Sequence, residues 1–174
     1  MDSLKSYIRS VPDFPKKGIN FYDITTLFQD PKGFGLALDA METYVRSRRP
    51  DKIVAIEARG FVFGAALADR LKIGLIPARK PGKLPANTIT EEYALEYGTD
   101  KLQLHADAIV KGDRVVVVDD LLATGGTLAA ACRLVEKLGG EVVGISAVIA
   151  LPFLPFEKQL AAYDVNYLIS YESE

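Results

Sequence analysis

Apolar residues follow two alternating patterns along the chain, and together these patterns predict its fold. Short continuous runs rich in Val, Ile and Leu are typical of buried strands, and longer stretches with apolar residues three or four positions apart are typical of helices. The expected strands are 52–56, 73–78, 114–118, 141–150 and 166–170, and the expected helices are 31–46, 60–71 and 126–138. Strands that alternate with helices predict an α/β fold with a mostly parallel sheet flanked by helices.

Two segments fall outside this alternation. The first 30 residues begin with apolar positions at helical spacing, which predict a short amphipathic helix over Leu4, Tyr7, Ile8 and Val11. Residues 79–105 begin as a basic loop and continue as two strand-like runs, 89–97 and 101–105, around Gly98-Thr99-Asp100. The second segment therefore predicts a β-hairpin with its turn at 98–100.

Length and charge limit the kinds of partner that the chain can have. Its 174 residues fit a single domain over 1–174, and its net charge of −2 gives no overall basic field. The longest apolar tract, 142–154, is interrupted by Gly, Ser and Pro and is shorter than the roughly 20 residues that span a bilayer. We therefore expect no nucleic-acid or membrane partner, and an anionic ligand would need a local site.

Cysteine, histidine and the N-terminal sequence add three expectations. Cys132 is the only cysteine and has small apolar neighbours, which favours a core residue and no internal disulfide. His105 is the only histidine and is expected to be structural, so no zinc site is expected. The first residues lack the apolar segment of a signal peptide, and we expect a cytoplasmic protein.

Three of the expected strand ends carry polar or glycine-rich sequence. They are Glu57-Ala-Arg-Gly60, Arg79-Lys-Pro-Gly-Lys83 and the segment from Asp119 to Thr127. In open parallel sheets, ligands bind in the crevice beyond the carboxyl ends of the strands. The three segments are therefore expected to meet at one site.

The loop between the strand at 114–118 and the following helix has the composition of an anion site. It consists of Ala123, Thr124, Gly125, Gly126 and Thr127. A helix N-terminus offers unpaired N–H groups, glycines let the backbone approach a ligand, and the threonine hydroxyls add donors. Phosphate is the anion that such a loop would hold, although an ordinary strand-to-helix turn capped by threonine has the same composition.

Asp119 and Asp120 precede this loop at the expected end of the strand, where they cannot both face the core. Carboxylates repel a phosphate but accept hydrogen bonds from neighbouring hydroxyl groups. A ribose 5-phosphate satisfies both the loop and the two acids. The alternative is that one aspartate caps the helix and the other is solvated.

The segment from Val115 to Thr127 resembles the ribose-phosphate signature of the type I phosphoribosyltransferases, which use phosphoribosyl diphosphate (PRPP). The version here is similar to that of the adenine-specific members of the family. Further blocks that resemble them appear in the family's order, and the resemblance covers most of the chain. These blocks are 11–15, 18–24, 57–61, 79–85 and 95–98.

This resemblance implies a fold, a reaction and several residue roles. It implies the type I fold, with a small N-terminal hood over 1–30 and a mobile flap hairpin within 79–105. The implied reaction forms AMP and diphosphate from adenine and PRPP with Mg²⁺ held mainly by PRPP and water, and the implied assembly is a homodimer. Asp119 and Asp120 would hold the ribose hydroxyls, and Glu96 on the flap would be the acid/base.

Cations and apolar residues complete the implied site. Arg59 would lie beside diphosphate and base, with Arg79, Lys80 and Lys83 as further diphosphate ligands. Adenine would be read by backbone groups near Ile19 and Asn20 and would pack between Phe21 and an apolar wall. That wall consists of Leu121 and Ala123.

Two other functions remain open from the sequence. A phosphoribosyltransferase for another purine, such as xanthine, would need polar groups in place of Leu121 and Ala123. A non-catalytic PRPP-binding regulator would normally carry a basic face or an extension for DNA. The alternative for Phe21 is an ordinary core aromatic, and the alternative for Glu96 is an exposed residue of the hairpin.

Overall fold

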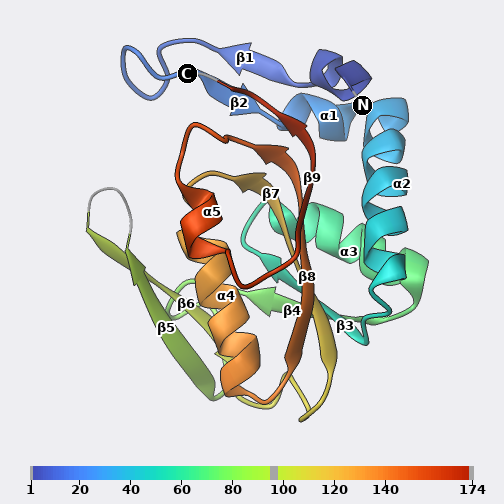
Figure 1. Ribbon diagram of the computed structural model, residues 1–174, viewed down its shortest axis with the longest axis vertical. Coiled ribbons are helices and arrows are strands. Elements are labelled where there is room, and N and C mark those ends of the chain that lie inside the picture. Colours follow the sequence, from blue (N-terminus) through green and yellow to red (C-terminus); the bar gives the residue numbers. More distant parts are fainter. Residues whose placement is uncertain (1, 95–97, 173–174) are drawn as a thin grey trace.

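The computed structural model of the protein describes residues 2–94 and 98–172 (Figure 1). A five-stranded parallel sheet forms its centre, in the strand order β4-β3-β7-β8-β9. Its strands are β3 (Lys52–Ile56), β4 (Gly74–Ala78), β7 (Arg114–Leu122), β8 (Glu141–Ala150) and β9 (Val165–Ser170). The predicted α/β fold with a parallel sheet is therefore confirmed.

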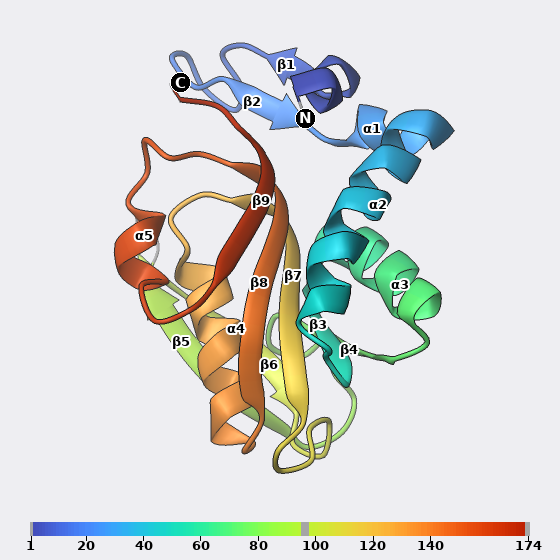
Figure 2. The same cartoon turned by 45° about the vertical axis from the view of Figure 1, so that its right-hand side comes forward.

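Helices cover both faces of this sheet (Figures 1 and 2). Two helices, α2 and α3, lie against one face, and α4 with the short α5 lies against the other. None of the helices in the described part of the chain combines the length and apolar character needed to cross a membrane. The bounds are α2 (Pro31–Ser47), α3 (Gly60–Leu71), α4 (Gly126–Lys137) and α5 (Phe156–Gln159).

The alternation of valines along β7 explains the two covered faces. Val115 and Val117 belong to the apolar cluster under α4, whereas Val116 and Val118 belong to the cluster under α2 and α3. Successive side chains of a strand point to opposite faces, so a strand buried on both sides reads as a continuous apolar run. The sequence of β7 therefore requires a helical layer on each side.

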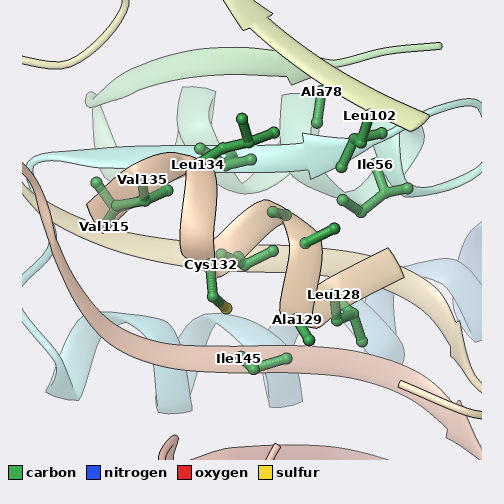
Figure 3. Packing of buried hydrophobic residues seen from close by; sticks show 14 of the residues in the cluster. Ile56, Ala78, Leu102, Val115, Leu128, Ala129, Cys132, Leu134, Val135 and Ile145 are labelled. Carbon is green, nitrogen blue, oxygen red and sulfur yellow. The ribbon is translucent and has the colours of Figure 1, made fainter. Parts of the chain in front are cut away.

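Close packing under α4 is shown in Figure 3, where Cys132 lies among Leu128, Ala129 and Ile145. Cys132 is fully buried, and burial raises the pKa of its thiol. A buried neutral thiol is a poor nucleophile. The prediction that Cys132 is a core residue is confirmed.

Helices α2 and α3 illustrate how local sequence sets the elements. Asp30 caps α2, since its Oδ1 accepts hydrogen bonds from the N–H groups of Lys32 (2.9 Å) and Gly33 (2.8 Å). In α3, a Cβ at Gly64 would lie 2.5 Å from the Cβ of Ala55 in β3. The absence of a side chain at this position allows α3 to approach the sheet closely.

The N-terminal region folds over the carboxyl end of the sheet (Figures 1 and 2). It contains the 3₁₀ helix η1 (Asp2–Tyr7), strands β1 (Arg9–Val11) and β2 (Phe21–Asp23), and helix α1 (Thr25–Gln29). The prediction of one helix through Val11 is wrong, because Val11 lies in β1 and pairs with Phe21 of β2. Cross-strand pairing overrides the helical spacing of the apolar residues here.

Strands β5 (Thr88–Ala94) and β6 (Thr99–His105) form an antiparallel hairpin, as predicted. The expected turn at 98–100 is wrong, because Thr99 pairs with Ala94 and Asp100 pairs with Tyr93. The connection therefore comes earlier, and its residues 95–97 lie outside the described part of the chain.

An ion-pair cluster attaches this hairpin to α4. The half-buried carboxylate of Glu91 in β5 accepts a hydrogen bond from Arg133 Nε at 2.6 Å and also pairs with Lys137 Nζ. The cluster holds β5 against the second half of α4.

Candidate active site

The ends of β3, β4 and β7 meet at one cavity, as the sequence predicts. The cavity has a volume of about 430 Å³ and is also bordered by the β5–β6 hairpin. Its lining includes Glu57, Ala58, Arg59, Lys80, Tyr93, Asp100, Asp119, Asp120, Leu121 and Thr127. Acidic and basic side chains thus face each other at the carboxyl end of the sheet.

The glycine-rich loop forms a smaller recess of about 70 Å³ next to this cavity. Gly125 has a φ of +81°, a left-handed conformation that glycine adopts without strain. At Gly126, the first residue of α4, a Cβ would lie 3.0 Å from the carbonyl oxygen of Ala94 in the hairpin. The recess is lined by residues 123–128 together with Asp119 and Leu121.

This recess has the geometry of an anion site. The N-terminus of a helix of twelve residues opens into it, so that unpaired N–H groups and the positive end of the helix dipole face the space. Thr124 and Thr127 are among the residues that line it. The anion-binding expectation for Ala123 to Thr127 is compatible with this geometry.

The two aspartates lie within β7 and not after its end. The strand was expected to end at Val118, but it continues to Leu122 because Leu121 and Leu122 pair with Ile149 and Ala150 of β8. Asp120 is only 5% exposed. A carboxylate buried to this degree needs a counter-charge or donors.

Arg59 supplies that counter-charge. Its Nε donates to Asp120 Oδ2 at 2.5 Å, and its guanidinium carbon lies 6.0 Å from the centre of the Phe21 ring. Arg59 therefore joins the end of β7 to the N-terminal region. Because it lines a second cavity as well as the first, Arg59 stands between the two.

Asp119 has a different environment, although it is adjacent in sequence. Its Oδ1 accepts a hydrogen bond from the N–H of Asp120 at 2.8 Å. Burial raises the pKa of Asp119 well above its ordinary value, and the negative charge of Asp120 raises it further. A Cβ at Gly60 would lie 3.0 Å from Asp119 Oδ1, so the glycine leaves room for this carboxyl group.

Glu57 organises the start of the basic loop. One oxygen of its carboxylate accepts from Arg79 Nε at 3.0 Å, and the other accepts from the backbone N–H of Lys80 at 2.8 Å. The Arg79 guanidinium also lies 5.9 Å from the Phe61 ring centre. Arg79 does not line the 430 Å³ cavity, whereas Lys80 does.

Lys80 reaches across the cavity to the hairpin. Its Nζ lies 2.9 Å from Asp100 Oδ2, and the Tyr93 hydroxyl donates to the same oxygen at 3.4 Å. The ion pair lowers the pKa of Asp100 and raises the pKa of Lys80. Lys83 lies farther along the loop, where its backbone carbonyl accepts from Arg79 Nη1 at 3.2 Å and its side chain is exposed.

The residues expected to surround a base are divided between two cavities. Phe21 lines the second cavity, of about 420 Å³, with Val11, Phe14, Asp23, Ile24, Thr25 and Arg59. Leu121 and Ala123 line the recess of the loop instead. Ile19 and Asn20 are half-buried just before β2, and Asn20 Oδ1 accepts from the Ser10 hydroxyl at 2.6 Å. Arg59 links these residues, because it lines the larger cavity with Leu121 and the second cavity with Phe21.

Comparison with known proteins agrees with this geometry. A family model described as a phosphoribosyl transferase domain matches residues 23–169. An adenine phosphoribosyltransferase from Koribacter versatilis is 53% identical over 171 residues, which cover 98% of this chain and 94% of the relative.

The chain belongs to the adenine phosphoribosyltransferase family.

Solved structures of this family share the fold over nearly the whole chain. The adenine phosphoribosyltransferase of Thermoanaerobacter pseudethanolicus superposes with a TM-score of 0.94 at 52% identity, covering 98% of this chain and 99% of that one. The enzyme from Saccharomyces cerevisiae, solved in complex with adenine and an imino-altritol bisphosphate, gives a TM-score of 0.91 at 37% identity, with 97% of each chain covered. The family and the type I fold expected from the sequence motifs are confirmed.

The sequence analysis gave no role to three residues of this adenine phosphoribosyltransferase site. Glu57 was visible at a strand end, but its role in holding Arg79 and Lys80 depends on the register of β3 against β4. Tyr93 and Asp100 enter the cavity because they pair across the hairpin. Glu96, the expected acid/base, lies outside the described residues.

Across the residues that the structure describes, no group of three or more His, Cys, Asp or Glu side chains could hold a metal ion. The acidic side chains of the site already accept from neighbouring groups, as in the Arg59–Asp120 and Lys80–Asp100 pairs. The expectation that Mg²⁺ is held mainly by PRPP and water stays a prediction.

The contrast between Asp119 and Asp120 gives a prediction for this family member. Ionised Asp119 is less favourable in the folded than in the unfolded chain, because its pKa is raised on folding. Its destabilising effect grows as pH rises above the unfolded-state pKa. Asp119→Asn should therefore raise the Tm at pH 7, measured by thermal unfolding. The increase in Tm should be smaller at pH 4.

Asp120→Asn is the matched variant and should lower the Tm, because Arg59 loses its partner. Both variants should bind PRPP about 10- to 100-fold more weakly, the effect of losing one charge-assisted hydrogen bond of about 1.5–3 kcal/mol. An unchanged Tm in Asp119→Asn would refute the argument from burial.

Proposed function

We propose that this chain transfers the phosphoribosyl group of PRPP to adenine and so forms AMP and diphosphate. The bond between N9 of adenine and C1′ of the ribose forms, the bond between C1′ and the diphosphate oxygen breaks, and N9 loses its proton. The observation that carries the proposal is the juxtaposition of the helix-terminal recess, two aspartates and two cations at one sheet end. The identity of more than 50% to adenine phosphoribosyltransferases supports the choice of base.

The recess at residues 123–127 suits the 5-phosphate of PRPP. Several N–H and hydroxyl donors converge there, and charge-assisted hydrogen bonds contribute about 1.5–3 kcal/mol each. Asp119 and Asp120 both line the larger cavity, and Asp119 also lines the recess, so the two carboxylates would accept from the ribose hydroxyls. Their negative charge would also favour the positive charge that develops at C1′ as the bond to diphosphate weakens.

The diphosphate would lie between Arg59 and Lys80, the two predicted cations that line the larger cavity. Both are paired with aspartates in the free protein, at 2.5 Å and 2.9 Å. A diphosphate would compete with Asp100 for the Lys80 ammonium and with Asp120 for Arg59. Arg79 and Lys83 remain proposed ligands from the basic loop, although Arg79 is paired with Glu57 here.

Adenine would enter the second cavity, where Phe21 offers an aromatic face. The enzyme from Saccharomyces cerevisiae was solved with adenine bound, and its fold matches over 97% of this chain. Arg59 lines both cavities and so adjoins both the base and the diphosphate. The backbone near Ile19 and Asn20 would read the edge of the base. Leu121 and Ala123 remain proposed as its apolar border, although they line the recess and not the Phe21 cavity.

We assign proton transfer to Glu96. The position of Ala94, whose carbonyl oxygen lies at the edge of the loop beside Gly126, supports this choice. Ala94 is the last described residue before the segment 95–97 that contains Glu96. A carboxylate that takes the N9 proton as the new bond forms would act as a general base.

Magnesium is the proposed cofactor. When bound, it neutralises the charge of the departing diphosphate. Since the described residues offer no complete ligand set, the ion would be held mainly by oxygens of PRPP and water. A cytoplasmic location remains a prediction, which fractionation of the source cells would test.

A homodimer is also proposed. Val62 on α3 and Leu75 on β4 are large apolar residues, 39% and 38% exposed, and β4 is an edge strand of the sheet. Exposed apolar side chains and an edge strand both favour association. Light scattering should give about twice the monomer mass of 19.0 kDa. A mass of 19.0 kDa would contradict the dimer.

The reaction is tested by supplying PRPP and Mg²⁺ with adenine, hypoxanthine, guanine or xanthine in separate absorbance assays. AMP should form from adenine. The oxopurines should be turned over at least about 100-fold less efficiently, because they carry a 6-oxo acceptor where adenine has an amino donor. Efficient turnover of xanthine would favour the other-purine alternative. PRPP binding without turnover of any base would favour a regulator.

Glu96→Gln tests the assignment of the general base. We expect kcat to fall by about 10²- to 10⁴-fold with little change in the KM for PRPP, because the amide cannot take a proton. Glu92→Gln is the control, since Glu92 is exposed on the same hairpin and pairs only weakly with Lys101 at 3.4 Å. If kcat is unchanged in Glu96→Gln, another group performs the transfer.

A further inference from the structure

An aromatic stack joins the N-terminal region to the C-terminal end of the chain. Tyr22 in β2 and Tyr171, which follows β9, have ring centroids 3.7 Å apart and planes within 15° of parallel. The ammonium of Lys5 in η1 lies 5.3 Å from the centre of the Tyr171 ring, within cation–π distance. Figures 1 and 2 both show the C-terminal end of the chain beside β1 and β2.

Tyr171 is itself fixed to the central sheet. Its backbone N–H donates to the carbonyl of Ala150 at 3.1 Å. Ala150 is the fully buried last residue of β8 and pairs with Leu122 of β7 and Ser170 of β9. Leu122 directly precedes the glycine-rich loop at Ala123. The Tyr171 ring is thus held by the same sheet end that carries the proposed phosphate site.

Tyr22 lies on the opposite side of β2 from the proposed base cavity. Phe21 and Asp23, its two neighbours, both line that cavity together with Arg59. Successive side chains of a strand point to opposite faces, so Tyr22 points away from the cavity and toward Tyr171. A displacement of the Tyr22 ring would therefore move the cavity wall formed by Phe21 and Asp23.

The β1–β2 hairpin needs such support. Its two strands have three residues each and form a sheet of their own, separate from the central sheet. An isolated two-stranded sheet is marginally stable in water and depends on packing against other elements. The stack of Tyr22 on Tyr171 provides a contact to the rigid sheet close to the residues that would touch the base.

We propose that Tyr171 is a positioning residue for the nucleobase. It does not contact the base but acts through Tyr22, which fixes the position of Phe21 relative to the phosphate loop. The proposal rests on the proposed function, in which the Phe21 cavity receives adenine. This positioning role requires the aromatic ring of Tyr171 and not its hydroxyl group.

The test compares steady-state kinetics of the full-length wild type with Tyr171→Ala, Tyr171→Leu and Tyr171→Phe. In the alanine and leucine variants the KM for adenine should rise about two- to tenfold, the range expected for loss of one aromatic pair. The KM for PRPP should stay within about twofold, because the phosphate loop is held by β7 and α4. Tyr171→Phe should behave like the wild type.

Tyr22→Ala should reproduce the effect, and the double variant should add little to either single one, because both remove the same contact. Tyr171→Leu keeps apolar bulk at the site and serves if Tyr171→Ala does not fold. An unchanged KM for adenine, or an equal rise in both KM values, would overturn the proposal. Failure of the wild type to form AMP would instead overturn the proposed function.

Discussion

The burial of Asp120 at the end of β7 is the constraint on which the site depends. A carboxylate that is 5% exposed requires a partner, and the Arg59 guanidinium provides it from the segment that follows β3. This pair fixes the ends of two neighbouring strands against each other. Gly60 must then follow Arg59, because a side chain there would meet Asp119. The beginning of α3 and the shape of the larger cavity follow from the same contact.

Three cations at this edge of the sheet have carboxylate partners. Arg59 pairs with Asp120, Arg79 with Glu57, and Lys80 with Asp100. Binding of an anion at these cations is therefore an exchange of partners. A single phosphate gains little from such an exchange, whereas a ligand with several negative charges can compete with the carboxylates. The helix-terminal recess differs, because the N–H groups at the start of α4 and not a cationic side chain would hold the anion there.

The site has two walls of different origin. The central sheet carries the phosphate recess, the two aspartates and Arg59, whereas the N-terminal region contributes Phe21 and the second cavity. Arg59 touches both walls from the sheet side, and Tyr171 touches the N-terminal region from the end of the chain. The geometry between sugar and base thus depends on contacts between segments that are distant in sequence.

The sequence by itself determined the central layer and the phosphate loop. The valines of β7, the capping Asp30 and the glycines before α4 act through local physics, in which strand alternation, helix capping and backbone freedom need no distant partner. For the same reason the sequence indicated that the segments at 57–60, 79–83 and 119–127 would meet. Only the tertiary structure decided which cations enter the cavity, that β7 continues through Asp119 and Asp120, and that Val11 is a strand residue. These features depend on strand register and on pairing across the chain, and a one-residue change of register would turn each side chain to the other face.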